Sequence, residues 1–282
     1  MDVQHLVLAL TCPDRPGIVH AVTGVLAARG GNITESQQFG DPGTSLFFMR
    51  VQAELPTPRA ELEADLADLA RRLDMRWRLD VVGRRMRTLV MVSREGHCLT
   101  DLLHRQRGGR LPIEVVGVVS NHETLRDVAG FFGVPYHHVP VTPATKPAAE
   151  ARLLALVETL DVELVVLARY MQVLSDEVCA RLAGRAINIH HSFLPSFKGA
   201  RPYAQAHERG VKLIGATAHY VTPDLDEGPI IEQDVERVDH ADDVAELVAV
   251  GQDVERRVLA RAVRWHAEHR VFVNGRKTVV FR

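Results

Sequence analysis

An asparagine and a histidine two residues apart, Asn188 and His190, are the residues whose types and spacing best suit chemistry. They lie in the stretch AINIHHSFLPSFKGARP, residues 186–202, where a short apolar run enters a polar loop containing Pro and Gly. Such a run predicts a strand whose C-terminal end opens into a loop, which is where open α/β sheets bind ligands. Because strand side chains alternate faces, Asn188 and His190 should point the same way. Together, an amide and an imidazole can polarise a carbonyl group and move a proton.

A third reactive group, the carboxylate of Asp226, lies in the stretch TPDLDEG, residues 222–228. Its Pro and Gly predict a tight loop, which should face the same crevice as the Asn188 strand. An Asp beside His190 would favour the imidazolium form and orient the ring. We therefore expect Asn188, His190 and Asp226 to be the catalytic residues.

Four residues, His190, His191, His219 and Asp226, raise the alternative of a metal site. The sequence has no HExxH motif or comparable local ligand spacing, so we expect no metal. His191 should point to the opposite side from His190 and support the site. His219, on a predicted strand, should be a core or supporting residue.

The composition favours a small-molecule partner. The 282 residues are 46% hydrophobic and 25% charged, with a formal net charge of -2, so no bulk attraction to nucleic acid or to an anionic membrane is expected. The three cysteines are far apart and form no CxxC pair, which argues against a disulfide framework. The sequence starts without a basic, apolar leader, and we expect a cytoplasmic protein.

Two domains are expected, with the boundary after Gly83, where the basic residues Arg84 and Arg85 follow. Residues 1–83 have the order β-α-β-β-α-β of a ferredoxin-like domain. The predicted strands cover 3–11, 32–39, 44–53 and 77–82, and the predicted helices follow Gly17 and cover 59–73.

This order, and the stretch PDRPGIV at residues 13–19, resemble the ACT regulatory domains. That resemblance implies an amino-acid effector, with Asp14, Arg15 and Gly17 as its expected contacts, and domain pairing into a homodimer or homotetramer. The free N–H groups at a helix start could hold the effector's carboxylate. Alternatively, Asp14 simply caps the helix.

Residues 84–282 alternate strands and helices, and runs such as VVGVVS are apolar on both faces. This pattern is typical of a doubly wound, mostly parallel sheet. The predicted strands cover 88–92, 114–119, 137–140, 164–168, 186–190, 213–221 and 228–235; the predicted helices cover 99–105, 123–132, 147–160, 175–183 and 241–268, and a hairpin with Asn274-Gly275 at its turn ends the chain.

Three stretches of this second domain closely resemble the folate-dependent formyltransferase family: NIHHSFLPSFKG, YMQVLS and GATAHYVTPDLDEGPII. The family's catalytic Asn-x-His and Asp match Asn188, His190 and Asp226. The resemblance implies a folate pocket and needs no cofactor or metal, since the folate is the substrate. The substrate-binding residues that it implies are Tyr170, Met171, Gln172, Val173, Leu174, Ser192, Lys198, Asp224 and Gly228.

An ACT-like domain in front of this fold resembles the family's deformylases, which hydrolyse 10-formyltetrahydrofolate to formate and tetrahydrofolate. The resemblance implies that the formate supplies purine synthesis and that the reaction balances the one-carbon pool. The turn after the first strand, residues 93–98, has a single Gly and bulky side chains and suits an acceptor phosphate poorly, which favours water as the formyl acceptor. Donors of Asn188 and His190 would stabilise the oxyanion, and Asp226 would handle protons. The alternatives are transfer to an amine acceptor and a folate-binding regulator without turnover.

Overall fold

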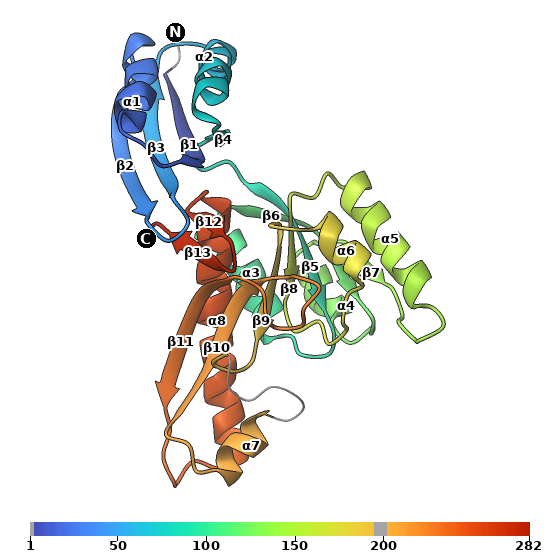
Figure 1. Ribbon diagram of the computed structural model, residues 1–282. Helices are drawn as coiled ribbons and strands as arrows, with labels where there is room; N and C mark the ends of the chain where they lie inside the picture. The colour runs from blue at the N-terminus through green and yellow to red at the C-terminus, as the bar shows by residue number, and fades with distance from the viewer. Residues whose placement is uncertain (1–2, 195–201) are drawn as a thin grey trace. The chain divides into compact units, whose positions relative to one another are not determined.

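The computed structural model describes residues 3–194 and 202–282, and the chain forms two compact units (Figure 1). The first comprises Met1–Arg84 with Glu268–Asn274 and Thr278–Arg282, and the second comprises Arg85–Ala267 with Gly275–Lys277. The sequence predicted a division after residue 83, but it gave no sign that the end of the chain joins the first unit.

The first unit is the predicted β-α-β-β-α-β domain. Its sheet has the order β2-β3-β1-β4, and β3 and β4 pair antiparallel with β1. The two helices bury apolar residues at helical spacing, Ile18, Val22 and Leu26 from one and Leu62, Leu66 and Leu69 from the other, which gives each a single core face. The elements are β1 (Gln4–Pro13), α1 (Ile18–Ala28), β2 (Asn32–Asp41), β3 (Leu46–Leu55), α2 (Arg59–Leu73) and β4 (Arg76–Val81).

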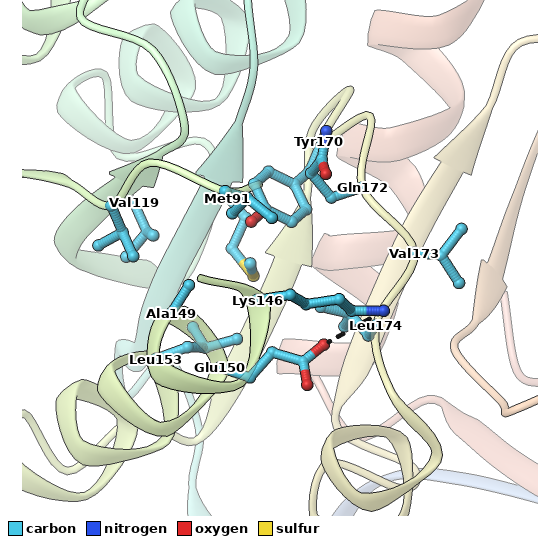
Figure 2. A pocket seen from close by; sticks show the side chains of 12 residues that line it. Met91, Val119, Lys146, Ala149, Glu150, Leu153, Tyr170, Gln172, Val173 and Leu174 are labelled. Carbon is cyan, nitrogen blue, oxygen red and sulfur yellow. Dashed lines mark ion pairs between the residues drawn. The ribbon is translucent and has the colours of Figure 1, made fainter. Parts of the chain in front are cut away.

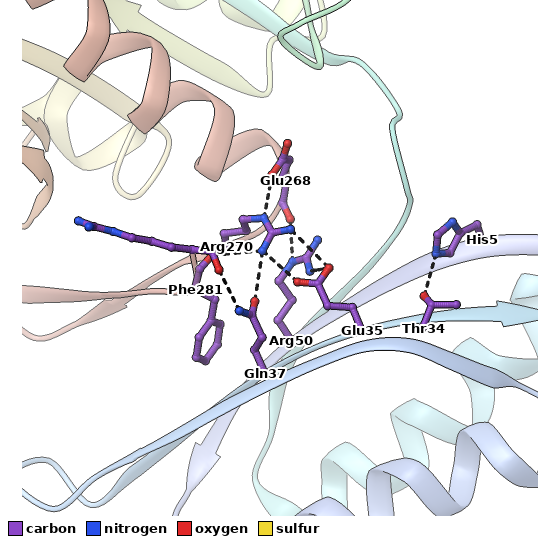
Figure 3. Close-up of polar contacts among 9 residues, drawn as sticks. His5, Thr34, Glu35, Gln37, Arg50, Glu268, Arg270 and Phe281 are labelled. Atoms are coloured by element: carbon purple, nitrogen blue, oxygen red, sulfur yellow. Dashed lines mark hydrogen bonds and ion pairs between the residues drawn. The ribbon is translucent and has the colours of Figure 1, made fainter.

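The C-terminal segment joins this unit through partly buried hydrogen bonds and ion pairs (Figure 3). The side chain of Arg50 in β3 is 2% exposed, and it pairs with Glu35 at 2.9 Å and donates to the carbonyl oxygen of Glu268 at 3.0 Å. Arg270 also contacts Glu35, at 3.0 Å. The segment ends in the predicted hairpin, β12 (Val271–Asn274) and β13 (Lys277–Val280), whose turn has Gly275 at a φ of 62°.

Asp80 in β4 is a second buried charge of this unit. Its carboxylate accepts hydrogen bonds from Arg84, twice at 2.7 Å, and from His269 at 3.0 Å. Burial alone would raise the pKa of Asp80, but the hydrogen bonds from His269 and Arg84 lower it well below its ordinary value. Because the folded pKa is the lower one, ionised Asp80 adds stability above the unfolded pKa of about 3.9, and this contribution is lost as pH falls through the folded pKa.

Replacing Asp80 by Asn is expected to lower the free energy of unfolding by about 1.5–3 kcal/mol at neutral pH, because the buried position loses its charge-assisted hydrogen bonds from Arg84 and His269. The difference from wild type should shrink as the pH falls below about 4. Urea unfolding at both pH values measures this. The control Asp68→Asn, whose side chain is 68% exposed, should stay within about 0.5 kcal/mol of wild type. Equal stability of Asp80→Asn and wild type at neutral pH would contradict the expectation.

The second unit is built on a seven-stranded sheet with the order β11-β10-β9-β8-β5-β6-β7. The strands β9, β8, β5, β6 and β7 are parallel to one another, and β10 runs antiparallel to β9 and β11. This arrangement agrees with the prediction of a mostly parallel sheet. The elements are β5 (Met86–Val92), α3 (His97–Arg107), β6 (Ile113–Ser120), α4 (Arg126–Phe131), β7 (Tyr136–His138), α5 (Lys146–Thr159), β8 (Leu164–Leu167), α6 (Asp176–Arg181), β9 (Ala186–His190), α7 (Pro202–Glu208), β10 (Leu213–Tyr220), β11 (Ile230–Arg237) and α8 (Val244–Ala267).

Helices cover both faces of this sheet (Figure 1). Val165 and Leu167 of β8 belong to one core cluster with residues of α5 and α6, and the alternate residues Leu164 and Val166 are equally buried. Helix α8 contacts β9, β10, β11 and α3. This double cover leaves the C-terminal strand ends as the open edge for a ligand. No helix in the described ranges combines the length and apolar character needed to cross a membrane.

Candidate active site

The end of β9 holds Asn188 and His190, as the sequence predicted. Strand β9 lies between β8 and β10, and its antiparallel register with β10 places Asn188 opposite His219. The amide Nδ2 of Asn188 and Nε2 of His219 are 3.3 Å apart. Nδ1 of His219 lies 2.9 Å from the carbonyl oxygen of Tyr220. In the neutral ring the proton is therefore on Nδ1, and Nε2 accepts from Asn188. His219 supports the site, as expected.

Asp226 lies on the tight loop between β10 and β11, at a left-handed φ of 57°. Its Oδ2 is 3.3 Å from Nδ1 of His190, and its Oδ1 is 3.6 Å from Nε2 of His219. Gly228 shapes this loop, because an added Cβ would lie 1.7 Å from the carbonyl oxygen of Tyr220. The structure thus brings the three predicted catalytic residues together.

The charge of Asp226 is stabilised by its two histidine partners. Burial by itself would raise the pKa of this carboxyl, but hydrogen bonds and positive charge from His190 and, when its ring is protonated, from His219 lower it well below its ordinary value. Asp226 is therefore ionised at neutral pH. Nε2 of His190 is buried and has no hydrogen-bond partner among the described residues, so it is the ring nitrogen left for a ligand.

A cavity of about 350 Å³ opens beside these groups. Met171 and Val173, 57% and 54% exposed, are apolar side chains on its wall, where a flat aromatic ligand could cover them. The residues of the predicted substrate set that line this cavity are Tyr170, Met171, Gln172, Val173, Leu174 and Asp224.

A smaller pocket shares part of this wall (Figure 2). Tyr170 and Leu174 line both pockets, and Tyr170 lies beside Met91 in this view. Burial raises the pKa of Tyr170 to about 12, so its hydroxyl stays neutral. Nearby, Lys146 and Glu150 pair at 3.8 Å. Tyr170 therefore anchors the cavity wall to the core.

Two described residues of the predicted substrate set, Ser192 and Gly228, do not line the cavity. Ser192 is 5% exposed and does not line the cavity; its carbonyl oxygen accepts from the hydroxyl of Thr217 at 2.9 Å. Gly228 packs against the backbone of Tyr220 instead. Lys198 lies outside the described residues.

The expectation that His191 points away from His190 is wrong. The two rings stack with centroids 5.1 Å apart and planes 20° apart, and both line the cavity. The strand ends at His190, so the alternation of side chains no longer holds for the next residue.

Sequence reasoning missed Glu255, which lies 1% exposed on α8 and contacts polar groups near the cavity. A signal was present in the helical spacing. Glu255 follows Gly251 by four residues and precedes Val258 and Leu259, all of which are buried. A carboxylate on the apolar face of a helix indicates a buried partner.

In the first unit, the expected effector contacts Asp14, Arg15 and Gly17 are all exposed just before α1. Gly17 is the N-terminal cap, with a φ of 92°, and no side chain caps the helix, so the alternative of Asp14 as a cap is wrong. Arg15 donates to the carbonyl oxygen of Arg72 at 3.1 Å.

Comparisons with known proteins agree with both resemblances. Residues 86–263 match the formyl transferase family model, and residues 6–64 match the ACT domain model. A formyltetrahydrofolate deformylase of Corynebacterium sp. (strain P-1) is 52% identical over 284 residues, covering 100% of this chain and 99% of that protein.

Solved structures extend the agreement to the fold. The crystal structure of a formyltetrahydrofolate deformylase from Burkholderia mallei ATCC 23344 has a TM-score of 0.96 at 52% identity, covering 99% of this chain and 100% of that one. Glycinamide ribonucleotide transformylase 1 of Symbiobacterium toebii, with a TM-score of 0.67 at 34% identity, covers 72% of this chain and 97% of its own. The chain belongs to the formyltetrahydrofolate deformylase family.

Proposed function

We propose that this protein hydrolyses 10-formyltetrahydrofolate to formate and tetrahydrofolate, with Asn188, His190 and Asp226 as the catalytic residues. The observation that carries the proposal is their convergence on one cavity, where Asp226 lies 3.3 Å from Nδ1 of His190. Deformylase relatives of full length support the reaction. The released formate would serve purine synthesis.

The amide of Asn188 is suited to stabilise the oxyanion. One of its N–H groups faces His219 at 3.3 Å, which orients the amide, and the second is left for the substrate. As water attacks the formyl carbon, the carbonyl oxygen gains negative charge, and a preorganised donor stabilises that charge.

The His190–Asp226 pair is suited to carry the proton. In neutral His190, Nδ1–H faces Asp226, so Nε2 holds the lone pair that takes a proton from the attacking water. The ionised carboxylate stabilises the imidazolium that forms. Nε2 then gives this proton to N10 as the C–N bond breaks, so tetrahydrofolate leaves with a neutral N10 amine. The new C–O bond is in formic acid, which loses the second proton of the attacking water to solvent and becomes formate.

Replacing Asn188 by Ala is expected to lower kcat about 100- to 1,000-fold, because the oxyanion loses its donor. Formate and tetrahydrofolate are measured after mixing 10-formyltetrahydrofolate with each protein, with no acceptor amine. Asn32→Ala, an exposed position of β2, serves as the control and should match wild type. A variant at position 188 with wild-type kcat would remove this residue from the scheme, and absence of formate from wild type would refute the function.

An amine acceptor is the second candidate, and the turn after β5 argues against it. Ser93 bonds to the side chain of Asn121 at 2.7 Å and to the backbone N–H of Met171 at 3.0 Å, and His97 bonds to Glu255 at 2.8 Å. These side chains are occupied within the protein and are not free to hold an acceptor phosphate. Preferential formylation of an added amine would favour this candidate.

The scheme needs neither metal nor cofactor, because Asn188, His190 and Asp226 supply both polarisation and proton transfer. We therefore expect kcat to be unchanged after treatment with a chelator. A loss of activity that added zinc restores would contradict this part of the proposal.

The ACT domain is proposed to bind an amino-acid effector at the exposed start of α1, near Asp14, Arg15 and Gly17. The uncapped N–H groups of this helix suit a carboxylate. The edge strands of its sheet, β2 and β4, suit pairing with a second copy, which supports a homodimer or homotetramer. Light scattering with and without added amino acids tests both points.

A further inference from the structure

A buried polar cluster lies beside the catalytic residues and has no part in the scheme above. Its centre is Glu255 of α8, with a side chain 1% exposed. One carboxylate oxygen, Oε2, lies 2.8 Å from Nε2 of His97 and 3.5 Å from Nε of Arg169; the other, Oε1, accepts from the hydroxyl of Tyr203 at 2.7 Å. Arg169 in turn hydrogen-bonds to Nδ1 of His191. We call His97, Arg169, His191, Tyr203 and Glu255 the Glu255 cluster.

A metal ion is a poor explanation for the cluster. His97, Cys98 and Glu255 have ligand atoms within 4.8 Å of one another. Both oxygens of Glu255 are already bonded, however, and the guanidinium of Arg169 beside it opposes a second cation. Burial raises the pKa of Cys98 well above its ordinary value, so its thiol stays protonated and binds metal weakly.

Arg169 is held in place at a cost. Its backbone is in the left-handed region, with a φ of 66°, which is a strained conformation for a non-glycine residue. Its carbonyl oxygen accepts from the backbone N–H of Ser93 at 3.2 Å, and its guanidinium lies between Glu255 and His191. Buried ion pairs and backbone strain of this kind often belong to functional sites.

The contact with Arg169 fixes the protonation of His191. A guanidinium only donates, so Nδ1 of His191 accepts and the single proton of the neutral ring is on Nε2. Burial, Arg169 and His190 lower the pKa of His191 to about 4, against the opposite effects of Glu255 and Asp226. The hydroxyl of Tyr203, the other titratable group facing the ring, stays neutral because burial and Glu255 raise its pKa. His191 is therefore a neutral N–H donor at neutral pH.

The two stacked rings at the cavity complement each other. Nε2 of His190 offers a lone pair, Nε2 of His191 offers a proton, and neither has a hydrogen-bond partner in the described part of the chain. The ring centroids are 5.1 Å apart. Both rings line the same cavity, and one water hydrogen-bonded at about 2.8 Å to each of two ring nitrogens can bridge them when they lie up to about 5.6 Å apart. It would donate to His190 and accept from His191, which leaves a second lone pair for the formyl carbon.

Resting on the function proposed above, we propose that the Nε2–H group of His191 binds the attacking water next to His190, and that Arg169, held by Glu255, is the positioning residue that fixes this proton. The Glu255 cluster thereby positions the attacking water within hydrogen-bond reach of His190. His191 touches a reacting atom, whereas Arg169 and Glu255 act through it.

The tautomer of His191 in the wild-type protein is the first test. Ring nitrogen–proton NMR spectra of the ¹⁵N-labelled full chain, with His191→Gln used to assign the signal, should show the proton on Nε2 and no second protonation above about pH 5. A proton on Nδ1, or a ring that titrates near its ordinary pKa of about 6.5, would overturn the proposal.

Arg169→Met is the second test, because methionine has comparable length and no donor. The expected kcat is about 10- to 100-fold below wild type at neutral pH with a nearly unchanged KM, since the water is misplaced while the folate pocket remains. The pKa of His191 should rise, which adds an acid limb to the pH profile of kcat. Arg169→Lys restores a donor and should recover part of kcat. Arg181→Met, at a half-exposed ion pair on α6, is the control.

The outcomes separate the two proposals. If wild type releases formate and Arg169→Met matches it in kcat and pH profile, the role of Arg169 is refuted and the hydrolysis stands. If wild type releases no formate, the proposed function fails regardless of the variants. If Arg169→Met does not fold, the tautomer of His191 in the wild-type protein decides whether the proposal about Arg169 and His191 stands.

Discussion

Asp226→Asn is expected to lower kcat about 10⁴-fold, because an amide does not stabilise the imidazolium that His190 becomes in the transition state. Asp226 lies 3.3 Å from Nδ1 of His190, and its histidine partners keep its pKa well below the ordinary value despite burial. The carboxylate is therefore charged from about pH 5 upward. Its ionisation should cause no change in the kcat of the wild-type protein between pH 5 and 8. Formate release across pH 5–8 measures both points.

Glu227→Gln is the matched control for this change. It removes a carboxylate from the next residue of the same loop, where the side chain is exposed. Its kcat should stay within about twofold of wild type, as for most exposed substitutions. A kcat of Asp226→Asn within about tenfold of wild type would show that the carboxylate is not part of the proton path.

His190→Gln is expected to lower kcat about 10³- to 10⁴-fold, since glutamine has no group that takes a proton from water at neutral pH. Folate binding should persist, because the cavity wall formed by Tyr170, Met171 and Val173 is untouched. Stopped-flow or fluorescence binding, measured beside formate release, separates the two effects.

The double variant His190→Gln/Asp226→Asn sharpens this prediction. If the pair acts as one proton-transfer unit, the double variant should be at most about tenfold slower than the slower single variant, because residues that act together are not additive. If the loss of kcat in the double variant equals the product of the two single losses, the two residues act in separate steps. His240→Gln, an exposed histidine, is the control for loss of an imidazole and should match wild type.

Local patterns predicted most of the fold, because turn residues mark the ends of its elements clearly. Helix α2 and strand β9 begin and end where the sequence predicts, at Arg59–Leu73 and Ala186–His190. Helix α7 was not predicted, since its seven residues follow a stretch that contains Pro and Gly. The packing of the C-terminal segment on the first unit was not predicted either. Arg50 and Glu268 are 218 positions apart in the sequence, and no local pattern predicts a contact over such a separation.

The convergence of Asn188, His190 and Asp226 on one cavity was predictable, because these residues stand at strand ends and turns with recognisable spacing. The surrounding network was not. The orientation of His191 depends on where β9 ends, and Glu255 approaches Arg169 from a helix that the sequence places far from the loop after β8. Lys198 lies outside the described residues and stays a prediction.

The most direct measurement is a single turnover of 10-formyltetrahydrofolate by wild-type protein in ¹⁸O-labelled water, without acceptor amine or added metal. Equal amounts of formate and tetrahydrofolate should form, and each formate should carry one oxygen from the solvent, because water is the nucleophile in this cavity. Formate without solvent oxygen, or a folate that stays formylated until an amine is added, would contradict hydrolysis at the Asn188–His190–Asp226 site.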